Sequence, residues 1–197
     1  MSHLLTKSSI VFRRVFLVAW IAAIITAAGS YIYDPANFSA EQLAAFMSRF
    51  GGTVWLIYII FSTFRGFTLL PSTPLVIAGT ILFPDHPWIV LAISVAGILI
   101  SSTMIYFFSD YLGFTAYFEN RKPKLSKKIR QRLDHPLGFL FVAGWAFFPL
   151  VPTDLVCYAA GTMRMKFPKF IAAIFAGEFA LCIIYIFFGG SLLQYMR

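Results

Sequence analysis

Residues 71–80 are PSTPLVIAGT, and residues 149–162 are PLVPTDLVCYAAGT. Both stretches begin with two prolines three residues apart and end with Ala-Gly-Thr. Proline cannot continue a helix, so each pair breaks the preceding helix and frees backbone carbonyls. Because both breaks interrupt long apolar segments, they decide how the chain can cross a membrane. The break residues are Pro71, Ser72, Thr73, Pro74, Pro149, Pro152 and Thr153.

The composition around these breaks is that of an integral membrane protein. Of the 197 residues, 59% are hydrophobic and 12% are charged, and this charged share is about half that of a soluble domain. A spanning helix needs about 20 apolar residues, so the chain has room for a handful of crossings in one all-α membrane domain. The net charge of +8 does not indicate nucleic-acid binding, because the basic residues gather at the ends of apolar runs.

The first 50 residues predict an anchor helix followed by a short helix in the membrane interface. The first expected span covers about residues 10–33, and the basic residues Lys7, Arg13 and Arg14 lie at its N-terminal end. It resembles a signal peptide but is long enough to span, so we expect an uncleaved anchor. Ser39 and Gln42 then have the spacing of a capping box. The apolar residues that follow at helical spacing are Leu43, Phe46, Met47 and Phe50.

Two full spans are expected further along the chain, from Trp88 to about Tyr111 and from Phe170 to about Leu193. Residues 53–64 and 137–148 are uncharged but too short to span, and each leads into a proline break. Between the halves lies the basic stretch 119–135. It is either a basic amphipathic helix on an anionic leaflet or a solvated loop, and in both cases it indicates the cytoplasmic side.

The two halves repeat each other. Residues 78–80 match 160–162, and Ala-Gly pairs at 96–97 and 176–177 follow at similar offsets. With the N-terminus and the basic stretch both inside, only one crossing separates residue 52 from residue 119. We therefore expect two re-entrant hairpins from opposite faces, each followed by a span. The alternative is a simple bundle with two proline-kinked spanning helices.

This interpretation divides the chain into two parts. Residues 1–50 form the N-terminal anchor and interfacial helices, and residues 51–197 form the membrane domain. Within that domain we expect a first repeat at 51–113, a cytoplasmic loop at 114–136 and a second repeat at 137–195. Broken helices in corresponding positions of inverted halves indicate a substrate site near the midplane of the bilayer.

The break motifs also resemble a known family. Arg65, the residues PSTPL at 71–75 and AGT at 78–80 resemble the first motif of the DedA superfamily, in its SNARE-associated Golgi protein (VTT-domain) branch. Residues 148–162 are similar to the second motif of that branch, although Ala146 replaces its usual arginine and Cys157 its usual asparagine. The resemblance covers about residues 50–195. It implies opposed re-entrant hairpins and lipid scrambling, lipid flipping or proton-coupled transport.

Three ionisable residues at membrane depth are candidates for the functional site: Arg65, Asp154 and Glu178. Arginine is a forked donor suited to a phosphate or carboxylate, and a buried acid can take up and release a proton. The alternative is a static ion pair that holds the hairpins together. Gly79 and Gly161 are expected to permit close helix approach. Cys157 and Cys182, inside apolar stretches, are expected to be buried free thiols.

No catalytic, metal-binding or cofactor motif is found, so we expect neither an enzyme nor a cofactor. The expected partners are membrane lipids, protons or a small solute, and the sequence leaves dimerisation open. The expected location is a bacterial inner (plasma) membrane, with the N-terminus in the cytoplasm. Two alternatives to lipid or proton-coupled transport remain: a small-ion transporter and a non-transporting membrane-organisation or assembly factor.

Overall fold

The computed structural model describes residues 33–68, 72–111, 120–121, 123–149 and 151–189, with single residues at 22, 25, 26, 29 and 30. The described residues form helices and no strands. Two segments among them are long and apolar enough to cross a membrane, Pro87–Ser109 and Phe167–Phe188. The all-helical membrane architecture expected from the sequence is therefore confirmed. Most of the predicted anchor, residues 10–33, lies outside the described residues.

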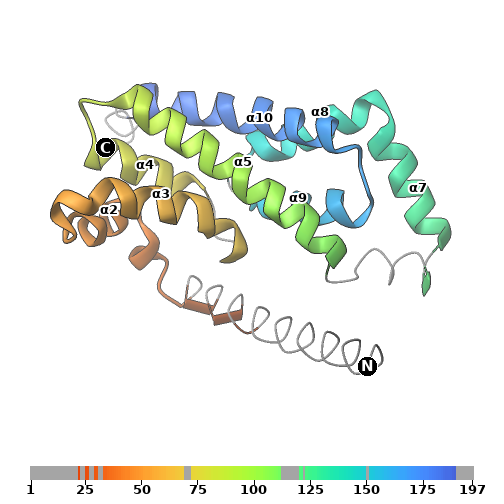
Figure 1. The fold of residues 1–197 in the computed structure, drawn as a ribbon, viewed down its shortest axis with the longest axis horizontal. Helices are drawn as coiled ribbons and strands as arrows, with labels where there is room; N and C mark the ends of the chain where they lie inside the picture. The colour runs from red at the N-terminus through yellow and green to blue at the C-terminus, as the bar shows by residue number, and fades with distance from the viewer. Residues whose placement is uncertain are drawn as a thin grey trace, which may run out of the picture.

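Of the two long helices, α5 (Pro87–Tyr111) runs diagonally through the middle of the molecule and α10 (Phe167–Ile183) lies along its upper edge (Figure 1). Helix α5 packs against α10, which continues into the π-helical turn η4 (Ile184–Phe188). Helix α10 begins three residues before the predicted Phe170, because a proline is well accommodated in the first turn of a helix. Leu193, its predicted end, lies outside the described residues.

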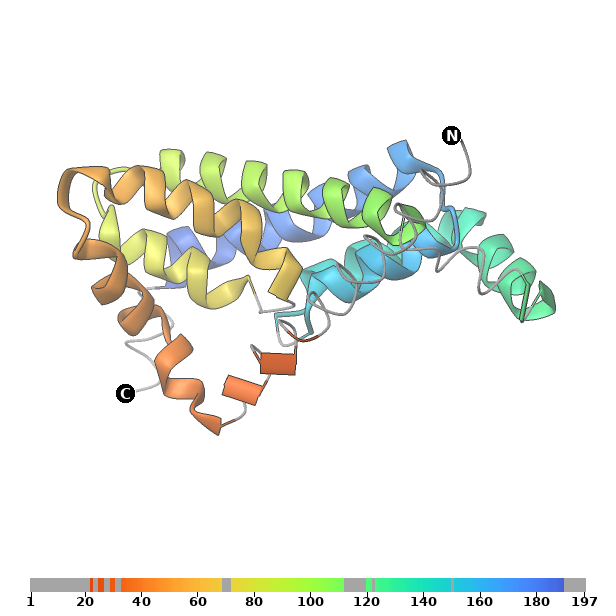
Figure 2. The same ribbon diagram turned by 60° about the horizontal axis from the view of Figure 1, so that its bottom comes forward.

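The first break separates α3 (Val54–Phe64), with its 3-10 extension η3 (Arg65–Thr68), from α4 (Thr73–Leu82). The second break separates α8 (Pro136–Phe147) from α9 (Thr153–Thr162). Pro71 and Leu150 lie outside the described residues. The end of α3 and the start of α4 lie near the middle of the molecule, close to α8 (Figure 2).

The broken helices pack on the two spans in a related way. Helix α3 packs against α5, and α8 packs against α10, so each first limb contacts the span of its own half. The second limbs pack differently from each other. Helix α9 packs against α5, the span of the other half, whereas α4 packs against both α5 and η4.

The N-terminal helix α2 (Ala40–Ser48) lies between two 3-10 turns, η1 (Pro35–Phe38) and η2 (Gly51–Thr53). Its predicted cap is present, since Ser39 accepts a hydrogen bond from the backbone N–H of Gln42 at 3.3 Å.

The residues predicted to form the apolar face of α2 are partly buried in the protein and partly exposed on its surface. Helix α2 packs against α4, where Ala40 and Ala44 lie against Ala78. Met47 is also buried, but Phe46 and Phe50 are exposed. The small alanines allow close helix approach, and that contact determines which face is buried.

The basic stretch contains a helix, α7 (Pro123–Asp134), at the end of the molecule opposite α2 (Figure 1). Its lysines and arginines are exposed, whereas Leu133 is buried. The Nζ atom of Lys169 donates hydrogen bonds to the carbonyls of Leu133, Asp134 and His135, at 2.8, 2.9 and 2.6 Å. A lysine in this position satisfies the free carbonyls at the end of a helix, and here it fixes the end of α7 to the start of α10.

The main core lies between α8, α9, α10 and the inner face of α5. It includes Cys157 and Cys182, both buried free thiols, as expected from their apolar surroundings.

Candidate functional site

The two proline breaks are in contact. Thr73 Oγ1 donates a hydrogen bond to the carbonyl of Pro149 at 3.5 Å, which joins one break directly to the other. The indole N–H of Trp145 donates to the carbonyl of Pro152 at 3.3 Å. Backbone carbonyls at the second break are therefore satisfied inside the protein, as backbone groups at membrane depth require.

Glu178 connects the two breaks a second time. Its Oε2 atom accepts a hydrogen bond from Ser72 Oγ at 3.4 Å, and its Oε1 atom accepts one from Thr153 Oγ1. Ser72 precedes α4 and Thr153 begins α9, so this carboxyl group on the span α10 holds both second limbs. Glu178 is only 1% exposed, and its hydrogen bonds offset part of its desolvation.

Arg65 and Asp154 form an ion pair beside these contacts. Arg65 Nη1 lies 3.6 Å from Asp154 Oδ2, and the two side chains are 7% and 1% exposed. Arg65 is at the start of η3, where the first limb ends, and Asp154 is in the first turn of α9. The partial positive charge of a helix N-terminus also favours a carboxylate in that turn.

The three charges that the sequence indicated are thus brought to one buried site. Among the described residues, three charged side chains are buried: Arg65, Asp154 and Glu178. One guanidinium faces two carboxyl groups, so the site has an excess of one negative charge unless a carboxyl group carries a proton. Within the described part of the chain, no cluster of His, Cys, Asp or Glu is placed to hold a metal ion.

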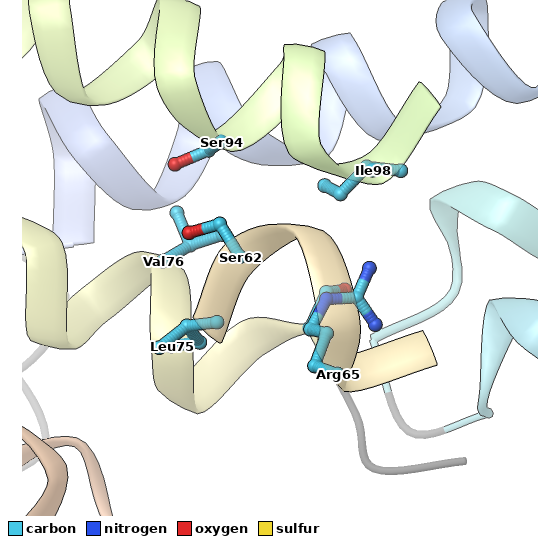
Figure 3. A pocket seen from close by; sticks show the side chains of 7 residues that line it. Ser62, Arg65, Leu75, Val76, Ser94 and Ile98 are labelled. Carbon is cyan, nitrogen blue, oxygen red and sulfur yellow. The ribbon is translucent and has the colours of Figure 1, made fainter. Parts of the chain in front are cut away.

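Several hydroxyl groups lie near Arg65, between the first limb and α5. Ser62 and Arg65 lie on the face of the first limb that is turned toward Ser94 and Ile98 (Figure 3). The small cavity that they line has no room for a water molecule. The hydroxyls of Tyr58 and Ser94 are hydrogen-bonded to each other, with 2.8 Å between the oxygens. The site is therefore closed to bulk water in this conformation.

One serine hydroxyl at the site has no hydrogen-bond partner in the described structure. It is Ser101 Oγ, in a side chain that is 0% exposed. A buried hydroxyl without a partner costs about 1–3 kcal/mol. Such groups are consistent with a site that donates to a ligand in another state.

Sequence analysis missed the serines of α5, although the sequence contains a signal for them. Four buried serines lie along this apolar helix at intervals of seven, one and seven residues: Ser94, Ser101, Ser102 and Ser109. This spacing keeps them on one helix face. A polar stripe in an apolar span indicates a face turned toward the protein interior.

Glycines bring the limbs close to the spans and to each other. A Cβ atom on Gly66 would collide with Ser101 Oγ and lie 2.7 Å from Asp154 Oδ1, so the turn after Arg65 fits tightly against the ion pair. A Cβ atom on Gly79 would collide with Tyr58, and one on Gly161 would collide with Tyr106 and Ser109 of α5.

The second half has no equivalent of Arg65. Ala146, where the family resemblance led us to expect an arginine, is fully buried. A Cβ atom on Gly177 would lie 2.8 Å from the Cβ of Ala146 and would collide with the carbonyl of Ala143. Helices α8 and α10 are therefore too close at this point for a guanidinium. The site is asymmetric, with its cation from the first half and its two acids from the second.

Comparison with known families agrees with this architecture. The family model of the VTT domain matches residues 70–191, more than half of the chain. The chain belongs to the VTT domain family. This is the domain of the DedA and SNARE-associated Golgi proteins, a membrane family often linked to transport or flippase roles.

The VTT match is narrower than the resemblance over residues 50–195, and it begins after Arg65. It includes Asp154 and Glu178 but not Arg65. Comparison with curated proteins and with solved structures gives no match.

Proposed function

We propose that this VTT domain protein is a proton-coupled membrane transporter that moves an anionic group past the Arg65–Asp154 pair. The buried ion pair between two broken helices, with a second acid beside it, carries this proposal. A charge at membrane depth is costly and is a functional hypothesis by default. The substrate is either a phospholipid, through its phosphate, or a small anionic solute.

The transport cycle depends on competition for Arg65. In the closed state the guanidinium is paired with the Asp154 carboxylate. When Asp154 takes up a proton, it loses the charge that holds the guanidinium, and Arg65 becomes available to an anionic oxygen. Arginine binds phosphate and carboxylate through two parallel N–H donors. When the proton leaves, Asp154 regains its charge, displaces the substrate and restores the pair.

Glu178 links this competition to the hairpins. It accepts hydrogen bonds from Ser72 and Thr153 and so holds the second limbs of both halves. We propose that the hairpins enter from opposite faces of the membrane. Opening one hairpin then breaks its bond to Glu178 while the other remains, which exposes the site to one face at a time. Alternating access around a midplane site between inverted repeats works in this way.

Reconstitution in liposomes tests this proposal. Two measurements are made on the same vesicles: the exposure of a fluorescent phospholipid to an external quencher, and the internal pH reported by an entrapped dye. Each is made with and without an imposed proton gradient. Movement of lipid that follows the gradient supports a proton-coupled flippase. Gradient-independent lipid movement indicates a scramblase instead.

The remaining outcomes separate the alternatives. If lipid does not move but an added anionic solute dissipates the pH gradient only in protein-containing vesicles, the substrate is the solute. If a folded protein moves neither lipid nor protons with any anion tested, the transport proposal is wrong. The assembly-factor hypothesis then becomes the better one.

A further inference from the structure

The elbow between α7 and α8 contains a cavity of about 450 Å³, well within the usual size range of ligand sites. It is separate from the buried charge cluster. Its lining residues come from the end of α7, the bend and the start of α8: Ile129, Arg132, Leu133, His135, Leu137, Gly138 and Phe141.

One wall of the cavity is cationic. Helix α7 contains five basic residues and one acid within Pro123–Asp134, and Arg132 lines the cavity itself. The Nδ1 atom of His135 accepts a hydrogen bond from the backbone N–H of Leu137 at 3.3 Å. A neutral imidazole that accepts through Nδ1 carries its proton on Nε2, so His135 retains a donor for a ligand. This wall suits an anion.

The other wall is apolar and continues onto the exposed surface of α8. Leu137 and Phe141 line the cavity and are 64% and 57% exposed, and Leu140 beside them is 63% exposed. Helix α8 is one of the short apolar helices of the membrane domain, whereas α7 is basic and polar. We therefore expect the chain to pass from the headgroup level into the hydrocarbon at the elbow.

The elbow is also held rigidly. Lys169 donates to the carbonyls of Leu133, Asp134 and His135, and a Cβ atom on Gly138 would collide with the carbonyl of Leu133. The cavity thus has a fixed shape between a cationic wall and an apolar wall. An anionic phospholipid has a matching arrangement, with a charged phosphate group next to an apolar acyl chain.

We propose that the α7–α8 elbow binds one anionic phospholipid of the leaflet that faces α7. The phosphate lies at Arg132 and His135, and an acyl chain lies along Leu137 and Phe141. The site does not depend on the proposed transport, because it shares no residue with the Arg65 cluster.

The test uses the full chain in detergent, with bound lipid counted by native mass spectrometry during titration. Phosphatidylglycerol and phosphatidylcholine with identical acyl chains are compared. Two pairs of exposed residues give matched variants. Arg132→Gln removes a cavity cation, and Arg130→Gln removes a cation of the same helix that does not line the cavity. Leu137→Ser and Leu140→Ser form the equivalent apolar pair.

We expect one phosphatidylglycerol to bind in preference to phosphatidylcholine. Arg132→Gln and Leu137→Ser should each weaken its binding about ten-fold, as expected for loss of a charged hydrogen bond or of a buried apolar contact. Arg130→Gln and Leu140→Ser should leave it nearly unchanged. Glycerol 3-phosphate, which has the phosphate but no chain, should not compete at equal concentration.

Three results would overturn the proposal. Equal losses in the two arginine variants would mean diffuse attraction by α7 rather than a site. Equal binding of both lipids would remove the role of the charge. Competition by glycerol 3-phosphate would assign the cavity to a soluble phosphate. All variants alter exposed side chains, and an unchanged melting temperature shows that each is folded.

Discussion

Arg65 Nη1 lies 3.6 Å from Asp154 Oδ2, and the pair joins the turn that ends the first limb of one hairpin to the start of the second limb of the other. Desolvation of such a pair can exceed its attraction. Stability alone is therefore a weak reason for these charges. An ion pair in which substrate can replace one partner is a better reason for them.

The first prediction separates a structural from a functional pair. If the pair is purely structural, removing one partner leaves a buried unpaired charge and costs about 3–5 kcal/mol, and neutralising both restores the protein. For a transport site, Arg65→Gln and Asp154→Asn should leave folded protein in the membrane but abolish flux, and the double variant should not recover it. Membrane yield, melting temperature and liposome flux are measured for all three.

The control for this series is Arg49→Gln, which removes an exposed arginine of the N-terminal region. It should retain flux and stability. Full flux in the double variant would exclude Arg65 and Asp154 from the transport site.

The second prediction concerns the close packing at Gly66. An added methyl group would meet Ser101 Oγ and Asp154 Oδ1, so Gly66→Ala should push η3 away from α9 and lengthen the ion pair. Overpacking of this kind typically costs about 1–3 kcal/mol. We expect a lower melting temperature and reduced flux. Gly144→Ala is the control, because a Cβ atom there meets nothing within 4 Å. An unchanged Gly66→Ala protein would contradict the observed packing.

The third prediction is the topology, with the N-terminus and residues 119–135 in the cytoplasm. It rests on the distribution of lysine and arginine. Single cysteines at Gln131 and at Asp85, both exposed, should react with membrane-impermeant reagents from opposite sides, in a background without Cys157 and Cys182. Reaction of both from one side would exclude opposed hairpins and favour kinked spanning helices.

Much of the fold was predictable because proline, charge and length constrain a membrane chain strongly. Pro74, Pro149 and Pro152 mark the breaks, and Arg65 and Asp154 stand out as charges in apolar stretches. Their meeting in space was an inference from the repeat. The side-chain links through Ser72 and Thr153 could not be derived, because a hydrogen bond depends on rotamers and on helix rotation.

Sequence reasoning could not foresee the packing that small residues determine. In α2 the alanines at 40 and 44 pack on Ala78 of α4, a contact that the sequence did not indicate. At Ala146, the close approach of Gly177 leaves no room for an arginine side chain. Close helix approach through small side chains has little signal in hydrophobicity, and it requires knowledge of both partners.

The last prediction concerns Ser101, whose buried Oγ has no hydrogen-bond partner in the described structure. Replacing this serine with alanine removes an unsatisfied polar atom, so Ser101→Ala should keep or raise stability, by up to about 1–3 kcal/mol. If the hydroxyl donates to substrate or carries protons when the site opens, flux should nevertheless fall. Ser109→Ala is the matched control, because Ser109 is equally buried on α5 but donates to the Tyr106 carbonyl at 2.8 Å. Flux and melting temperature are compared for both variants. Equal flux in the two would mean that Ser101 has no part in transport, whereas a loss of stability in Ser101→Ala would mean that its hydroxyl has a structural partner.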